Sequence, residues 1–254
     1  MPAEPVAAPI RQLALTSARE LIRSGFTAGV MVFIFVSFVV ILLVLDAVLP
    51  AAAGTSLLAR GIGAVAAWGF LSISVIGTAV PLVAYRERGT LALLATTPAG
   101  RRNLLVGQLP VRAAIAAIEG LIVLMLMAVV GESTPLMLIA AAVTLLCGAA
   151  MFLALGLLIG ARGTNVDAVM QIGLLAPVVL IATSGAVIPL TILPDWLAAV
   201  FRALPTTWFV TAFDSAEQQS WTDALAVWGG LTAVAVAALL VAIRLFDWGV
   251  EKAR

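Results

Sequence analysis

The chain has 254 residues, of which 63% are hydrophobic and only 11% are charged, whereas soluble domains are about 45–50% apolar and about 25% charged, so most of this protein lies in lipid. Its 14 basic and 13 acidic residues nearly cancel, which excludes a nucleic-acid-binding protein, because such proteins need an excess of Lys and Arg. The absence of histidine and the single cysteine, Cys147, exclude histidine-based catalytic triads, histidine or thiolate metal sites and an intrachain disulfide.

The N-terminal region is predicted to have two parts. Residues 1–9 contain three prolines and are predicted to be disordered. From Ile10 to Arg23, apolar residues recur at helical spacing with arginines on the opposite side, which predicts an amphipathic helix at the inner membrane surface. The alternative is that this segment is a basic flank whose only role is to set the topology of the chain. Residues 10–254 are predicted to form a single transmembrane domain.

Six windows are apolar over the about 20 residues that a helix needs to cross a membrane. They are Phe26–Leu45, Ile62–Tyr85, Asn103–Val130, Pro135–Ala161, Val166–Ile188 and Ala224–Phe246. The first could instead be a signal peptide, but its apolar run is longer than the about 7–15 residues of a signal sequence. The third contains Pro110, Arg112 and Glu119, so its spanning part is either the whole window or only Ala113–Val130. The sequence therefore predicts an all-α integral membrane protein with six transmembrane helices.

The distribution of Lys and Arg predicts the orientation. If the N-terminus is cytoplasmic, the inner segments hold eleven of these residues and the outer ones only Arg60 and Arg202, with Arg112 unassigned. An excess of positive charge marks the cytoplasmic side, so both termini are predicted to be cytoplasmic. The predicted location is a bacterial plasma membrane, and the Ala- and Arg-rich, Lys-poor composition is typical of a GC-rich bacterium.

The connection between the second and third windows predicts a short cytoplasmic helix. Thr90 can cap its start, Gly89 permits a sharp exit from the span, and Pro98 ends it. The helix carries three leucines, namely Leu91, Leu93 and Leu94. So many leucines in a loop that faces only water would be unusual, which indicates contact with a partner protein. The alternative is that they pack against the protein's own helices or the lipid interface.

The same segment resembles the E-x-G-T-L…T-P signature of type-2 ABC exporter permeases, the membrane subunits of drug-resistance and polysaccharide exporters. Glu87, Gly89 and Thr90 match the signature position by position. In that family the segment is the coupling helix, which docks in a groove of the ATP-binding subunit. The resemblance implies that coupling to an ATPase involves Arg86, Glu87, Arg88, Gly89, Thr90, Leu91, Leu94 and Pro98.

Arg112 and Glu119 are ionisable residues inside the third window, which makes them candidates for a translocation path. They are seven residues apart, so on a continuous helix they point the same way but lie about 10 Å apart, too far for a direct ion pair. If the span begins at Ala113, Arg112 extends to the inner interface and only Glu119 is deep. Glu119 could line a substrate path or carry a proton. We favour a structural role, in which it pairs with another subunit or stays protonated.

A second resemblance lies between the fifth and sixth windows. Pro194 before Asp195 predicts a helix start, and Pro205 is predicted to end the turn. Two short apolar pieces with Trp196 and Trp208 at interfacial depth are predicted to dip into the outer membrane surface without crossing it. The same family has a pair of short outer helices here, with a similar P…LP-x-W-L…LP pattern.

The resemblance implies a membrane subunit of an ATP-driven exporter that is not itself an enzyme. Two six-span subunits, identical or related, would surround a central path in the lipid membrane, with two ATP-binding subunits docked beneath them. The only lysine is Lys252, so the chain has no P-loop, and Mg-ATP is expected on the partner rather than on this chain.

The few fixed charges suit an amphipathic or hydrophobic, drug-like or lipid-like substrate. Two other hypotheses stay open. One is an ATP-independent, proton-coupled carrier, for which Glu119 is the only convincing intramembrane acid. The other is a regulatory or immunity subunit with exporter architecture.

Overall fold

The computed structural model describes residues 25–48, 57–96, 101–130, 133–183, 193–218 and 221–248, and within these ranges the chain forms only helices and the turns between them. The predicted disordered segment, the predicted N-terminal amphipathic helix and Pro98 lie outside the described residues. The all-α prediction is confirmed.

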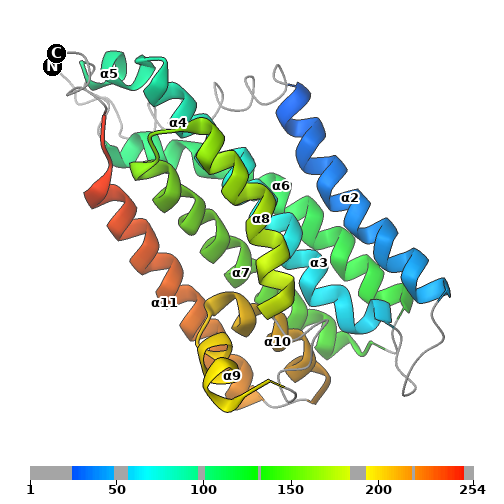
Figure 1. Ribbon diagram of the computed structural model, residues 1–254. Helices are drawn as coiled ribbons and strands as arrows, with labels where there is room; N and C mark the ends of the chain where they lie inside the picture. The colour runs from blue at the N-terminus through cyan, green and yellow to red at the C-terminus, as the bar shows by residue number, and fades with distance from the viewer. Residues whose placement is uncertain are drawn as a thin grey trace, which may run out of the picture.

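The helices form one elongated bundle (Figure 1). In chain order they are α2 (Gly25–Val48), α3 (Leu57–Ser74), the π-helix η2 (Val75–Ala79), α4 (Val80–Glu87), α5 (Thr90–Ala95), α6 (Arg101–Val130), α7 (Pro135–Arg162), α8 (Val166–Thr183), α9 (Asp195–Arg202), α10 (Pro205–Gln218) and α11 (Trp221–Leu245). Figure 1 shows α5 at one end of the bundle and α9 and α10 at the other; we call these the α5 end and the α9 end.

Among the described residues, five helical segments are long and apolar enough to cross a membrane: α2, the continuous run α3–η2–α4, α6, α7 and α11. The fifth predicted span is present as the shorter α8, which is followed by residues 184–192, outside the described ranges. α9 and α10 are bent by 86° at their junction, as expected for a broken span or a segment that enters and leaves the same face.

The third window lies in one continuous helix, α6, which passes through Pro110 rather than beginning at Ala113. Pro110 lies inside α6, where it cannot donate a backbone hydrogen bond. Such prolines are tolerated in membrane helices when neighbouring groups satisfy the backbone. The carbonyl that loses its usual donor is that of Val106, four residues earlier. Close to Pro110, the guanidinium of Arg112 donates hydrogen bonds to the carbonyl oxygens of Gln108 at 2.9 Å and Gly77 at 3.0 Å, which joins this stretch of α6 to η2.

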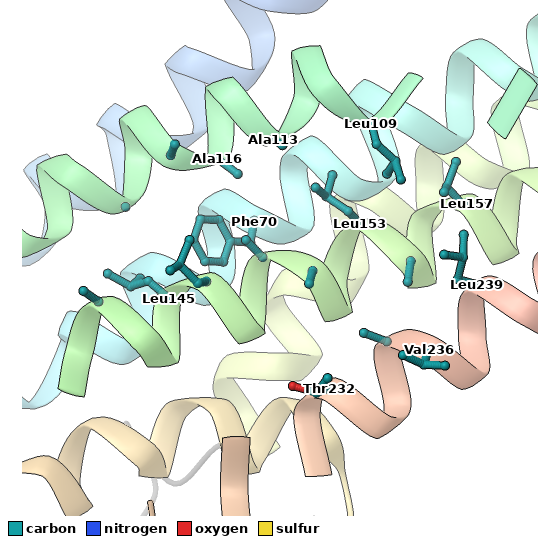
Figure 2. A pocket seen from close by; sticks show the side chains of 18 of the residues that line it. Phe70, Leu109, Ala113, Ala116, Leu145, Leu153, Leu157, Thr232, Val236 and Leu239 are labelled. Carbon is teal, nitrogen blue, oxygen red and sulfur yellow. The ribbon is translucent and has the colours of Figure 1, made fainter. Parts of the chain in front are cut away.

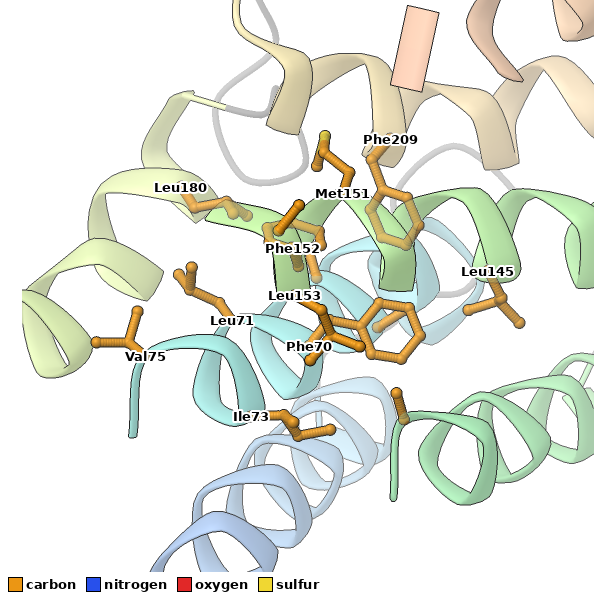
Figure 3. Packing of buried hydrophobic residues seen from close by; sticks show 14 of the residues in the cluster. Phe70, Leu71, Ile73, Val75, Leu145, Met151, Phe152, Leu153, Leu180 and Phe209 are labelled. Carbon is orange, nitrogen blue, oxygen red and sulfur yellow. The ribbon is translucent and has the colours of Figure 1, made fainter. Parts of the chain in front are cut away.

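The core lies between the run α3–η2–α4 and α7, with α10 closing it at the α9 end. Its centre is a set of aromatic rings from three helices. Phe70 of α3, Phe152 of α7 and Phe209 of α10 are labelled in Figure 3, and Phe213 of α10 packs on Phe209. Their ring centroids lie 5.5 to 6.3 Å apart in tilted or edge-to-face pairs, the arrangement that aromatic quadrupoles favour. α10 is therefore more than a superficial outer piece, because its first turns are part of the core.

α3 and α7 approach each other closely at Gly156. A Cβ atom on this residue would lie 2.2 Å from the carbonyl oxygen of Ser74, a contact that real Cβ atoms do not make. The Ser74 hydroxyl donates a hydrogen bond to the carbonyl oxygen of Phe152, which fixes the same contact. Only glycine fits here.

We expect Gly156→Ala to destabilise the protein by about 1–3 kcal/mol, because the added methyl group forces the two backbones apart. Gly229→Ala is the matched control, since a Cβ on Gly229 of α11 meets nothing within 4 Å. The measurement is the thermal unfolding midpoint of each variant in detergent. Equal midpoints for the two variants would contradict the close contact.

Candidate functional site

The turn between α4 and α5 depends on Gly89. Its φ angle is +72°, in the left-handed region that side-chain-bearing residues avoid, and it precedes the first residue of α5. The helix cap is thus Gly89 and not Thr90 as predicted; Thr90 is already helical. A Cβ on Gly89 would meet nothing within 4 Å, so the backbone conformation alone requires glycine. The predicted short helix is confirmed as α5.

The leucines of α5 point in different directions. Leu91 is fully buried, whereas Leu93 is 72% exposed and Leu94 is half-buried. Leu91 belongs to a compact group that we call the α5-end cluster: Leu82, Leu91, Leu104, Leu105, Leu157, Ala161, Ala242 and Phe246. Leu91 therefore packs against the protein's own helices, as the second interpretation expects, whereas contact of Leu93 with a partner protein stays a prediction.

Arg86, at the end of α4, binds the end of α7. Its guanidinium donates hydrogen bonds to the backbone carbonyls of Gly160, Ala161, Gly163 and Asp247. Gly160 and Ala161 lie in the last turn of α7, whose carbonyls have no partner within the helix. A cation is favourable there because the helix dipole is negative at its C-terminus.

Glu87 binds the start of α8. Its Oε1 accepts a hydrogen bond from the backbone N–H of Val166, the first residue of α8, at 2.9 Å. The Asn165 side chain accepts another from the N–H of Ala168 at 3.0 Å. A carboxylate suits this position because the first N–H groups of a helix lack partners and the dipole is positive there. Two adjacent side chains of α4 therefore hold the end of α7 and the start of α8.

The residues that the resemblance implicated in coupling thus face two ways. Arg86, Glu87 and Leu91 contact the protein's own helices, whereas Arg88 is exposed. Glu87 is exposed as well as bonded, and Leu93, which the resemblance does not implicate, is also exposed. Sequence reasoning missed the partners of Arg86 and Glu87 in the connection between α7 and α8 and after α11. The opposite charges of Arg86 and Glu87 at the end of α4 are a signal that these side chains bind the ends of other helices. The sequence does not indicate which helices these are.

Arg112 and Glu119 make separate contacts inside the bundle. Arg112 is 5% exposed and bound to the carbonyl of Gly77 in η2, so its side chain points into the bundle and not outward. Glu119 is 6% exposed, and a Cβ on Gly69 of α3 would lie 2.4 Å from its Oε2. Within the described part of the chain, this Oε2 has no hydrogen-bond partner.

An apolar groove of about 570 Å³ lies between α6, α7 and α11 (Figure 2). Its lining is almost entirely alanine and leucine, with Phe70 at its base and Thr232 as a polar exception. Small residues of α6 and α7, such as Ala113 and Ala149, make room for it. Neither Arg112 nor Glu119 lines this groove, which can hold an apolar chain or ring system.

The α9 end carries the outer-helix motif. Pro194 precedes α9, as predicted, whereas Pro205 is the first residue of α10 and does not end a turn. Trp196 is 69% exposed, and the indole N–H of Trp208 donates a hydrogen bond to the carbonyl oxygen of Arg202 at 2.6 Å. Trp208 thus fixes the bend between the two helices.

Among the described residues, no group of three or more acidic, cysteine or histidine side chains is placed to hold a metal ion.

In the comparisons with known proteins, a family model described as an ABC-2 type transporter matches residues 11–217. The match covers both the turn between α4 and α5 and the junction of α9 and α10. The comparison with curated proteins found no match.

Proposed function

Because the chain belongs to the ABC-2 type transporter family, in which the permease works with an ATP-binding subunit, we propose that it is the membrane subunit of an exporter driven by ATP hydrolysis on that separate subunit. The chain is a multi-pass membrane protein. We further propose that the α5 end faces the cytoplasm of a bacterial cell, which the positive charge there supports, and that two permease chains enclose the path.

The main support for the proposal is the set of contacts that α5 and the end of α4 make at the α5 end. α5 presents the exposed Leu93 on one side and inserts Leu91 into the α5-end cluster on the other. At its base, Arg86 and Glu87 are bonded to α7 and α8. A displacement of α5 is therefore transmitted to two spans besides its own.

The mechanism that we propose follows these contacts. Mg-ATP bound by the partner supplies the free energy as the ATP-binding subunits close, and Leu93 receives the resulting displacement. Leu91 and the turn at Gly89 pass it to α4, Arg86 passes it to the end of α7, and Glu87 passes it to the start of α8. A partner that binds one arrangement of these helices more tightly shifts the equilibrium between inward-open and outward-open states.

The substrate class follows from the surfaces that the spans offer. The groove of Figure 2 offers alanine, leucine and a phenylalanine ring but few polar groups. Such a surface suits hydrophobic or amphipathic molecules, because apolar area removed from water provides most of the binding free energy. We therefore propose an amphipathic, drug-like or lipid-like substrate rather than a sugar or an ion.

Leu93→Asp tests this function. We expect it to weaken binding of the ATP-binding subunit by at least about tenfold, because a charge would replace an apolar contact at the centre of the docking surface. Leu93→Met is the matched control and should retain binding. The measurement is the dissociation constant of the purified subunits in detergent.

Equal affinity of Leu93→Asp and the unmodified chain would contradict α5 as the docking site. Export by this chain in the absence of any ATP-binding subunit would instead favour a proton-coupled carrier. The buried, unpartnered carboxyl oxygen of Glu119 would then be the group to examine.

A further inference from the structure

Resting on the proposed function, we propose that the segment Phe246–Trp248, which follows α11, is part of the coupling site and positions Arg86. This segment lies outside the signature that the resemblance identified and beyond the residues that the family model matches. It connects the sixth predicted span to the same guanidinium that holds α7. The coupling site then joins α4, α7, α8 and α11 at one point.

The first line of evidence is polar. The carbonyl oxygen of Asp247 accepts two hydrogen bonds from Arg86, one from Nε at 3.0 Å and one from Nη2 at 2.9 Å. The backbone N–H of Asp247 donates to the carbonyl oxygen of Ala161 at 3.2 Å. Because Ala161 is itself bonded to Nη2 of Arg86, the three residues form a closed set of contacts. The planar guanidinium can satisfy both carbonyls only in one orientation.

The second line of evidence is apolar and independent of these hydrogen bonds. Phe246 is 2% exposed and belongs to the α5-end cluster with Leu91. The guanidinium carbon of Arg86 lies 5.8 Å from the centre of the Phe246 ring, within the range of a cation–π contact. Trp248 packs edge-to-face on Phe246, with ring centroids 5.1 Å apart. The segment thus contacts both the buried side of α5 and the side chain at its base.

These contacts indicate positioning rather than assembly of the fold. α11 packs against α7 over much of its length, whereas Phe246 and its neighbours contact the bundle only at the α5 end. Without the segment, Arg86 loses two of its five hydrogen bonds and the ring beside it. The three hydrogen bonds to Gly160, Ala161 and Gly163 remain, but the guanidinium is no longer held in one orientation, so a displacement of α4 moves α7 less.

The test uses chains of different length, each purified in complex with the ATP-binding subunit. One ends at Trp248 and keeps the segment; another ends at Leu245 and lacks it. Two full-length variants, Phe246→Ala and Phe246→Tyr, isolate the ring. All carry Cys147→Ser and Trp196→Cys, so that a single thiol reports on the α9 end. The readouts are the amount of bound ATP-binding subunit and the change in labelling by a membrane-impermeant maleimide on adding a non-hydrolysable ATP analogue.

We expect every form to bind the ATP-binding subunit. The nucleotide should change the labelling rate in the full-length chain, in the chain ending at Trp248 and in Phe246→Tyr. The change should fall by at least about fivefold in the chain ending at Leu245 and in Phe246→Ala. A defect that only affected folding would lower the amount of bound ATP-binding subunit in the same proportion as the labelling change. Phe246→Tyr is the matched control for Phe246→Ala, because it keeps the aromatic ring.

Two results would overturn the role of this segment while leaving the proposed function intact. One is a full nucleotide response in the chain ending at Leu245. The other is a nucleotide response that falls as much in the chain ending at Trp248 as in the chain ending at Leu245. If the full-length chain itself neither binds an ATP-binding subunit nor responds to nucleotide, the proposed function fails and this inference fails with it.

Discussion

Arg86→Ala is expected to abolish ATP-driven transport while the ATP-binding subunit stays bound. The substitution removes the guanidinium that donates hydrogen bonds to four backbone carbonyls, and it takes the charged donor away from the carbonyls of Gly160 and Ala161 at the end of α7. Hydrogen bonds to charged groups contribute about 1.5–3 kcal/mol each. We therefore expect a lowered unfolding midpoint and a loss of nucleotide-driven transport of at least about a hundredfold.

Arg86→Lys and Arg244→Ala sharpen this prediction. Lysine keeps the charge but not the planar set of donors, so partial activity is expected. Arg244 is exposed in the last turn of α11, and its replacement makes the same change in charge but leaves the hydrogen bonds of Arg86 to α7 in place. Transport per hydrolysed ATP and the unfolding midpoint should thus fall for Arg86→Ala but not for Arg244→Ala. Equal effects of Arg86→Ala and Arg244→Ala would show that the contacts with α7 do not transmit the displacement.

Glu87→Ala should act in the same direction as Arg86→Ala but more weakly, since the Glu87 carboxylate accepts one hydrogen bond, from the start of α8. The measurement is transport per hydrolysed ATP, and a loss as large as that of Arg86→Ala would contradict this ranking.

Gly89→Val has the second-largest expected effect. The left-handed conformation costs a side-chain-bearing residue about 1–2 kcal/mol, and β-branched residues more. Since a Cβ at this position meets no other atom within 4 Å, the penalty comes from the backbone alone. α5 should turn away from its position over the α5-end cluster, and ATP hydrolysis coupled to transport should fall at least about tenfold.

The choice of substituent distinguishes this cause from a steric one. Asparagine adopts the left-handed conformation more readily than alanine or valine, so activity should decrease in the order Gly89, Asn, Ala, Val. Gly229→Val in α11 is the matched control, because its φ is ordinary and its surroundings are open. The measurement is nucleotide-driven transport by each purified complex. Activity that follows side-chain volume, with Asn no better than Val, would contradict the backbone explanation.

The helices could be predicted from the sequence because their physical cause is local. A helix must close its own backbone hydrogen bonds in lipid, so long apolar windows mark α2, α6, α7 and α11 directly. The turn before α5 was also predictable, since Gly89 allows a conformation that other residues avoid. Pro110 left the start of the third span open in the sequence, because a proline inside a membrane helix does not necessarily end it.

The partners of the charged residues could not be predicted, because they are backbone groups brought close only by the fold. Glu87 was expected at the docking surface, yet it accepts a hydrogen bond from Val166, which lies 79 residues further along the chain. Likewise, Arg112 bonds the carbonyl of Gly77 in a π-helix that no hydrophobic pattern predicts. Carbonyls and N–H groups occur at every position, so they leave no signal in the sequence.

The central claim is that nucleotide binding by the partner at the α5 end changes the exposure of the α9 end. It is tested most directly by labelling Trp196→Cys, in a Cys147→Ser chain, with an impermeant maleimide in vesicles that contain the ATP-binding subunit. We predict that a non-hydrolysable ATP analogue changes the labelling rate severalfold, and that this change disappears when the ATP-binding subunit is omitted. A labelling rate that is the same with and without nucleotide, in a complex shown to bind both, would contradict the account.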